Sequence, residues 1–196
     1  MVDGETLAVS PNSVIRCLSI APFTLEREES IDEILSRTLT VWISGDAQVE
    51  MGREIDEDTV DFWEKQKEKY REGSDSYNNA HSILYGHEED QAPKDALEVL
   101  SAYITDVNPD GLIFSRGSNF DFPMIETLFK QSGLPLPYST WKVACSKSII
   151  RFLCEDNKDT EANLVNGLKS NHTSSYDVAV EIKKLQAIHA VLRDDQ

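Results

Sequence analysis

Apolar and β-branched residues gather in short stretches of the amino-terminal half, and this pattern predicts β-strands. Residues 13–23 are rich in apolar and β-branched side chains, and residues 38–44 alternate before a Gly-Asp turn signal. The opening residues, MVDGETLAVSP, predict a further short strand. Side chains alternate between the faces of a strand, so Asp3 and Glu5 point the same way. Residues 24–37, between two of these strands, are polar and predict a loop with one short helical turn.

Helical spacing of apolar residues dominates the rest of the chain. Residues 55–73 start with Asp56 as a candidate N-cap, carry acidic side chains in the first turn, and end with basic residues before a glycine. Residues 93–107 begin at a proline and place apolar side chains on one face. The polar residues 74–92 predict a loop, with room for a short helix. Further helices are predicted at residues 120–133, 146–155 and 176–193.

Strands that alternate with helices predict an α/β domain with a central mixed β-sheet flanked by helices. The strands at 13–23 and 38–44 follow each other directly, so we expect them to be antiparallel. The apolar run at 110–115 follows a helical crossover, so we expect a buried strand parallel to its neighbour. A chain of 196 residues fits a single domain over residues 1–196.

Composition and charge narrow the class of protein. Hydrophobic residues make up 40% of the chain, which indicates a globular protein. The net charge of −16 disfavours tight nonspecific binding of nucleic acid, unless a bound divalent metal or a local cationic groove overrides it. Three cysteines without metal-ligand spacing predict free thiols in a reducing compartment. No signal peptide and no membrane-spanning run is recognised, so we expect a cytoplasmic protein without a membrane partner.

Acidic residues at four places are candidates for chemistry. Asp3 and Glu5 repel each other on one strand face unless a cation or a proton lies between them. Asp121 follows the predicted strand at 110–115, at the carboxyl edge of the sheet where α/β proteins form ligand sites. Asp177 lies near the start of the last helix, five residues after His172.

The order of these residues and the sequence around them resemble a known family. The set Asp3-x-Glu5, Asn119-Phe120-Asp121 and His172-x4-Asp177 resembles the three exonuclease motifs of the DEDDh family of 3′–5′ exonucleases. The resemblance covers about residues 2 to 190. Within the family, the stretches MVDGETLAVSPNSVIRCLSIAPF, GREIDEDTVDFWEKQ and SRGSNFDFPMIETLFKQSGLPLPYSTW are most similar to exonuclease A of tailed phages and to bacterial exoribonucleases.

The resemblance implies a ribonuclease H-like (DEDD exonuclease) fold and a metal-dependent hydrolase. By analogy, Asp3, Glu5, Asp121 and Asp177 hold two Mg²⁺ or Mn²⁺ ions, and His172 is the general base. Such a pair of ions clamps both oxygens of an in-line displacement at phosphorus. The implied substrate is single-stranded DNA, or alternatively RNA, which is shortened from the 3′ end to 5′-monophosphates. If the gene is phage-encoded, the expected compartment is the bacterial host cytoplasm.

Two departures from the family pattern keep a different class of function open. Only two residues precede Asp3, which makes the first strand short, and phage members often carry Arg-Asp where this chain has Ala144-Cys145. The alternatives are therefore a catalytically weak or inactive DEDD-fold binding protein, or an exoribonuclease. The sequence carries no signal for the oligomeric state.

Several residues near the motifs allow a structural or a substrate-binding role. Trp63 on the helix at 55–73 is expected in the core rather than against a base. Of Phe120 and Phe122, one is expected to pack inward and the other to lie under a terminal nucleotide. Arg53 and Arg116 are expected on the solvated surface rather than on phosphates.

Overall fold

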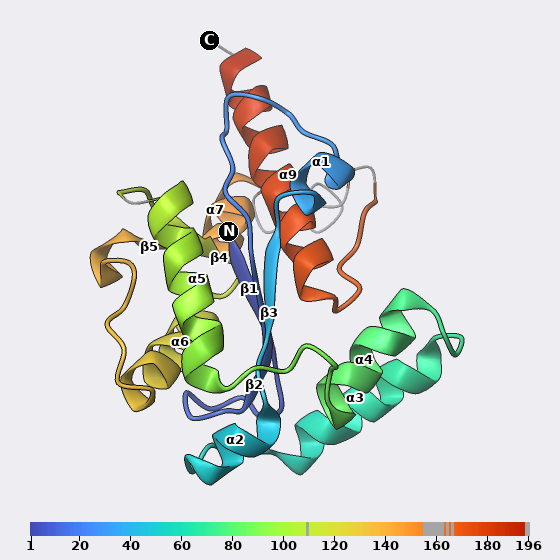
Figure 1. Cartoon of the computed structure of the whole chain (residues 1–196). Coiled ribbons are helices and arrows are strands. Elements are labelled where there is room, and N and C mark those ends of the chain that lie inside the picture. Colours follow the sequence, from blue (N-terminus) through green and yellow to red (C-terminus); the bar gives the residue numbers. More distant parts are fainter. Residues whose placement is uncertain (109, 155–162, 164, 166, 195–196) are drawn as a thin grey trace.

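A five-stranded mixed sheet with the order β3-β2-β1-β4-β5 forms the centre of the structure (Figure 1). This computed structural model describes residues 1–108, 110–154, 163, 165 and 167–194. β1 pairs antiparallel with β2 and parallel with β4; β2 and β3 are antiparallel, and β4 and β5 are parallel. The strands are β1 (Val2–Thr6), β2 (Ile15–Ile20), β3 (Leu39–Trp42), β4 (Ile113–Ser115) and β5 (Val143–Cys145).

Helices cover both faces of the sheet. The long helix α9 packs on β1 and β2 together with α1 and α7, whereas α5 and α6 pack on the other face (Figure 1). α3 and α4 form a hairpin at one end of the sheet. The helices are α1 (Ile31–Leu35), α2 (Gly45–Glu50), α3 (Glu57–Lys69), α4 (Asp75–Tyr85), α5 (Pro93–Val107), α6 (Ser118–Gln131), the 3₁₀ turn η1 (Thr140–Lys142), α7 (Ser146–Leu153) and α9 (Ser174–Asp194).

The sequence pattern predicted most of these elements. The antiparallel pair β2 and β3, the parallel strand β4 and the helix α5 lie where the pattern placed them. Asp56 caps α3 as predicted, since its side chain accepts a hydrogen bond from the Asp58 N–H. Two short elements were missed: α2, where only a turn was expected, and β5, which is three residues long.

Residues 74–92, where a loop with room for a short helix was expected, contain all of α4, a helix of 11 residues. Ser74 caps this helix, and its hydroxyl accepts from the Tyr77 N–H. Asparagines and serines hide the helical pattern, but Ala80 and Ile83 lie three residues apart and are fully buried against Trp63. Packing against α3 therefore stabilises a helix that its own composition does not favour.

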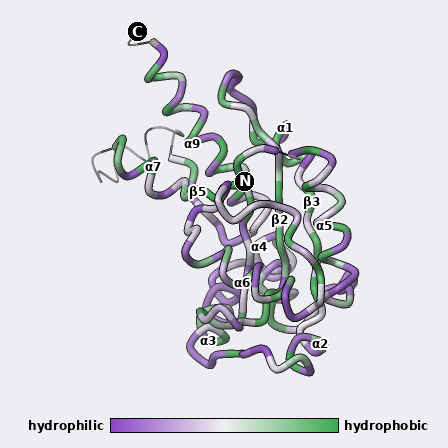
Figure 2. The backbone as a smooth tube through the Cα atoms, turned by 90° about the vertical axis from the view of Figure 1, so that its left-hand side faces the viewer, coloured by the Kyte–Doolittle hydropathy of each residue, from purple (hydrophilic) through white to green (hydrophobic). Residues whose placement is uncertain are grey.

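The two faces of β1 differ in chemistry. Val2 and Gly4 face the apolar core beneath α5 and α6, and a Cβ atom at Gly4 would come within 2.8 Å of Leu18 Cδ2. The glycine thus allows β1 and β2 to approach closely. Asp3 and Glu5 face α9 instead. In Figure 2 the outer helices alternate between green (hydrophobic) and purple (hydrophilic) stretches.

Two buried arginines join β2 and the residues before it to other parts of the fold. Arg16 donates hydrogen bonds to the carbonyl of Ile83 and forms an ion pair with Asp90 at 2.7 Å, which ties the α3–α4 hairpin to β2. Arg53 is 4% exposed and donates to the Ser13 carbonyl at 2.7 Å. The expectation of a solvated Arg53 was therefore wrong, because its guanidinium satisfies carbonyl groups inside the fold.

Among the helices that the structure describes, none combines the length and the apolar character needed to cross a bilayer.

The core beneath α5 gives a prediction for stability. Leu97 is fully buried there, whereas Val99 on the same helix is 43% exposed. We expect Leu97→Ala to lower the free energy of unfolding by about 2–5 kcal/mol, because it leaves a cavity. Val99→Ala should change it by only about 0.5 kcal/mol. Urea denaturation measures both variants, and equal losses would contradict the packing described here.

Candidate active site

The α9-facing side of β1 carries polar side chains where a sheet face normally carries apolar ones. Asp3 pairs with Ser19 and Glu5 pairs with Cys17 across the β1–β2 ladder. Asp3 is half-buried and Glu5 is buried. Because cross-strand partners share a face, four polar or sulfur-bearing side chains lie together beneath the start of α9.

A chain of hydroxyl groups fixes the start of α9 on this surface. The Oγ atoms of Ser19 and Ser174 lie 2.6 Å apart, and Ser19 Oγ lies 2.8 Å from Thr40 Oγ1. Ser174 is the first residue of α9 and is buried. The hydroxyl chain thus joins β2, β3 and α9, and it places Asp177, three residues further along the helix, over β1.

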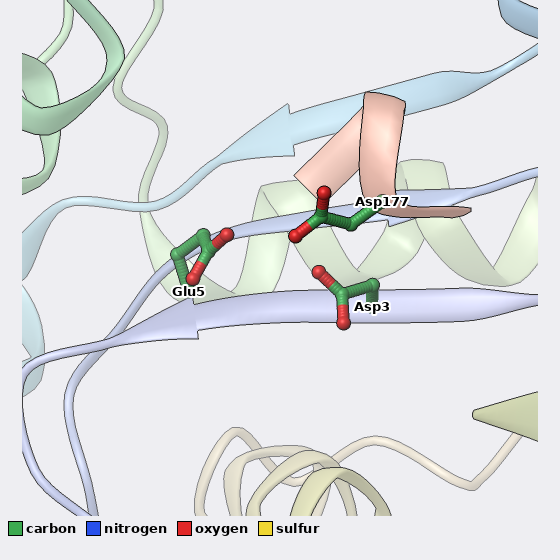
Figure 3. A group of neighbouring side chains, drawn as sticks. All are labelled: Asp3, Glu5 and Asp177. Carbon is green, nitrogen blue, oxygen red and sulfur yellow. The ribbon is translucent and has the colours of Figure 1, made fainter. Parts of the chain in front are cut away.

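Three carboxylates converge at this point. One oxygen each from Asp3, Glu5 and Asp177 lies within 4.8 Å of the other two, and Figure 3 shows the three side chains facing one another. The Ser170 hydroxyl and the Asn171 N–H both donate hydrogen bonds to the Asp177 carboxylate. Asp177 therefore has a fixed orientation relative to β1.

Asp121 approaches the same place from the other side of the sheet edge. It lies in the first turn of α6, directly after β4, and is buried. It lines the same cleft as Asp3, Glu5 and Asp177. The structure thus brings all four predicted carboxylates to one cleft, although Asp121 is not part of the tight group of three.

Burial raises the pKa of all four carboxyl groups, and the neighbouring carboxylates add to this effect at Asp3 and Glu5. Burial, with the charges of Asp177 and Asp121, raises the pKa of Glu5 to about 8. Burial and the neighbouring carboxylates raise the pKa of Asp3 well above its usual range. Burial also raises the pKa of Asp121 to about 6 and raises that of Asp177. Such crowding is favourable only when protons or cations neutralise it.

The donor set fits a hard divalent cation. Among the described residues, no arginine or lysine forms an ion pair with Asp3, Glu5 or Asp177. Carboxylate oxygens are the ligands that Mg²⁺ and Mn²⁺ prefer. The site therefore has the ligand chemistry for such an ion, and no arginine or lysine in the described part of the chain pairs with these three carboxylates.

His172 lies at the rim of the cleft in a conformation that is rare for a residue with a side chain. Its φ angle is +59°, and its carbonyl accepts a hydrogen bond from Asn79 Nδ2 at 2.6 Å. Its ring lies edge-on to Phe62, with the centroids 5.2 Å apart. Burial lowers the pKa of His172, and this effect exceeds the opposing effect of the Asp177 charge. The imidazole is therefore neutral at pH 7 and able to accept a proton.

The cleft has a volume of about 690 Å³, and a second hollow of about 410 Å³ adjoins it. Gly4, Glu5 and Phe120 line both, so the two form one groove that passes over Glu5. Phe62 and Trp63 line the smaller hollow. Trp63 is nonetheless a core residue, as expected, and its Nε1 donates to the Thr6 carbonyl. Phe122 is buried and Phe120 is 37% exposed, so one of this pair packs inward.

Sequence reasoning missed Glu181, a fifth carboxylate near the cleft. It is buried one turn after Asp177 on α9 and pairs with Arg116 and Lys184. The expectation of a solvated Arg116 was thus wrong in part. The side chain is 41% exposed, but it forms an ion pair with Glu181. The spacing Asp177-x3-Glu181, on an otherwise apolar helix face, was the available signal.

Comparison with known protein families matches residues 1–189 to the Rv2179c-like domain, which is described as a 3′–5′ exoribonuclease domain. No curated protein and no solved structure matches the chain. The mixed five-stranded sheet flanked by helices is consistent with the ribonuclease H-like exonuclease fold that the sequence resemblance implied.

The raised pKa of Glu5 predicts how the metal-free protein responds to pH. A carboxyl group ionises near pH 4.5 in the unfolded chain but near pH 8 in the folded one, so the folded state holds the extra proton between these values. The stability contributed by this group is complete below pH 4.5 and is lost as the pH rises to about 8. We expect Glu5→Gln to weaken this decline, measured by thermal unfolding in EDTA.

Glu98→Gln serves as the matched control, because Glu98 is an exposed carboxylate on α5 outside the cleft. This variant should keep the pH dependence of the parent protein. A Glu5→Gln protein whose melting temperature falls with pH as steeply as that of the parent would contradict the crowding of charge.

Proposed function

The chain belongs to the Rv2179c-like family of 3′–5′ exoribonuclease domains and is a 3′–5′ exonuclease; we propose that it removes 5′-monophosphates from the 3′ end of single-stranded RNA. The sequence resemblance favoured DNA as the substrate and exonuclease A of tailed phages as a similar protein. The family match supports a 3′–5′ exonuclease but not that phage relationship, and its description favours RNA. We propose further that residues 1–196 form one exonuclease domain.

The crowded carboxylates are the observation that carries this proposal. Asp3, Glu5, Asp121 and Asp177 would hold two Mg²⁺ or Mn²⁺ ions, as the DEDDh resemblance implies. The ions would supply Lewis-acid activation of a water molecule and neutralise charge on the phosphate. Bound there, they would also reverse the local field, so that a protein of net charge −16 could accept a phosphodiester.

His172 acts in this proposal as the general base. It lines the cleft with the carboxylates, and its lowered pKa keeps the ring neutral near pH 7. A neutral imidazole is able to accept a proton from the attacking water. The Asn79 hydrogen bond to the His172 carbonyl holds the residue at the rim, where its side chain lines the cleft.

The aromatic hollow next to Glu5 suits the terminal nucleoside. Phe62 and Phe120 are both partly exposed there, at 38% and 37%. Stacking on an aromatic ring contributes about 1–3 kcal/mol per base and tolerates any base. With the terminal base in this hollow, the phosphate on its 5′ side lies above the carboxylates.

The structure removes one reason for the alternative of an inactive binding protein. That alternative rested partly on a first strand too short to hold Asp3. All five residues of β1 pair with β2, and Val2 also pairs with Ser115 of β4. Asp3 therefore lies inside a ladder rather than at a frayed end.

We expect Asp121→Asn to lower the hydrolysis of RNA by on the order of a hundredfold or more, because one ligand oxygen loses its charge. The measurement is release of 5′-monophosphate in Mg²⁺ or Mn²⁺. Asp46→Asn on α2 is the control and should retain full activity, since Asp46 lies outside the cleft.

Calorimetric titration with Mn²⁺ separates the enzyme from the inactive alternative. The exonuclease predicts Mn²⁺ binding that Asp3→Asn weakens strongly, and Asp46→Asn leaves it unchanged. Folded protein that binds no Mn²⁺ and hydrolyses neither RNA nor DNA would leave the inactive binding protein as the better explanation.

Substrate class has its own test. RNA and DNA oligonucleotides of the same sequence differ at the 2′-hydroxyl, which is what a protein can contact to distinguish them. We expect kcat/KM to be about tenfold or more higher for the RNA, the equivalent of at least one hydrogen bond. Equal or faster hydrolysis of the DNA strand would contradict RNA as the substrate.

A further inference from the structure

Three cationic side chains line the cleft that holds the four carboxylates. Arg116 precedes α6, and Lys147 and Arg151 lie on α7. In a protein with 35 acidic and 19 basic residues, three cations at one cleft are a local exception to the global charge.

The spacing of the two α7 cations suits a strand of phosphates. Lys147 and Arg151 are exposed and four residues apart, so they lie on one helix face about 6 Å apart along the axis. This separation is on the scale of neighbouring phosphates in an extended single strand. The exposed Ser148 lies between them and also lines the cleft.

An exposed aromatic ring continues this face. Phe152 follows Arg151 directly, lies one turn after Ser148, and is 82% exposed. Cations beside an aromatic ring are typical of surfaces that bind single-stranded nucleic acid, where phosphates contact the cations and bases stack on the ring. The combination therefore favours a nucleic-acid strand over an isolated anion.

The two halves of the groove define a direction for the strand. The aromatic hollow lies on one side of Glu5, and the three cationic side chains line the cleft on the other side. We infer that the α7 face of Lys147, Ser148 and Arg151 binds the backbone of the substrate upstream of the scissile phosphate. The preferred substrate is then a single strand of several nucleotides rather than a dinucleotide. This inference rests on the proposed function, which puts the 3′ end in the aromatic hollow.

The test compares a decanucleotide RNA with a dinucleotide. A dinucleotide has one internucleotide phosphate, which the carboxylate site occupies, so it gains little from α7. We expect the double variant Lys147→Ala/Arg151→Ala to lower the ratio of kcat/KM for the decamer to that for the dinucleotide by about tenfold or more. The slope of log affinity against log salt for the decamer should become shallower by about 1.4, which is 0.7 for each lost phosphate contact.

The matched control is Lys94→Ala/Lys130→Ala. It removes the same net charge from exposed lysines on α5 and α6 that do not line the cleft. This control should keep both the ratio and the salt slope of the parent protein. A loss of the same size in the control would show that overall charge, not the α7 face, sets binding. Arg116 stays unchanged in both variants because it pairs with buried Glu181.

The outcomes separate this inference from the proposed function. Unchanged ratio and unchanged salt slope in the α7 variant would overturn the inference while leaving the exonuclease intact. A parent protein that hydrolyses neither substrate would overturn the proposed function instead. In that case fluorescence anisotropy with a labelled decamer still decides the α7 face: binding that the α7 variant loses and the control keeps supports it, and equal binding overturns it.

Discussion

The fold is organised around carboxylates with which no cation in the described part of the chain pairs. Asp3 and Glu5 occupy positions on β1 that would otherwise pack apolar side chains against α9, and Asp177 is placed over them by the helix itself. Among the described residues, no arginine or lysine pairs with these three groups. Burial raises the pKa of all three groups, and the neighbouring carboxylates raise the pKa of Asp3 and Glu5 further. A bound divalent ion would relieve this crowding of charge.

Glu181 shows the opposite arrangement only one turn further along α9. Its carboxylate is buried but pairs with Arg116 and Lys184 and accepts from the Ser146 hydroxyl at 2.9 Å. This cluster joins α9 to the loop before α6 and to the start of α7, so it holds together the elements that form the cleft walls. One helix thus carries one carboxylate that the protein neutralises and one that it leaves available for a metal ion.

The two hollows that form the groove differ in the chemistry of their side chains. The net charge of −16 disfavours binding of nucleic acid over the surface in general. Aromatic rings line the hollow next to Glu5, and cations line the adjoining cleft with the carboxylates. In the proposed mode of binding, a single strand would place its 3′ end over the carboxylates, because a duplex offers neither a free terminal base nor a flexible backbone there.

The pattern of apolar and polar residues was enough to predict the alternation of strands and helices and the shared face of Asp3 and Glu5, because strand and helix periods are local properties. The resemblance to the DEDDh motifs picked out Asp121, His172 and Asp177. Neither predicted the length of α4, whose polar composition is overcome by packing on α3, or the burial of Arg53 and Glu181, which depends on partners distant in the sequence. The folded structure alone brings three of the four carboxylates into a tight group and places the cations of α7 in the lining of the same cleft. These are distances between side chains far apart along the chain, and no local pattern encodes them.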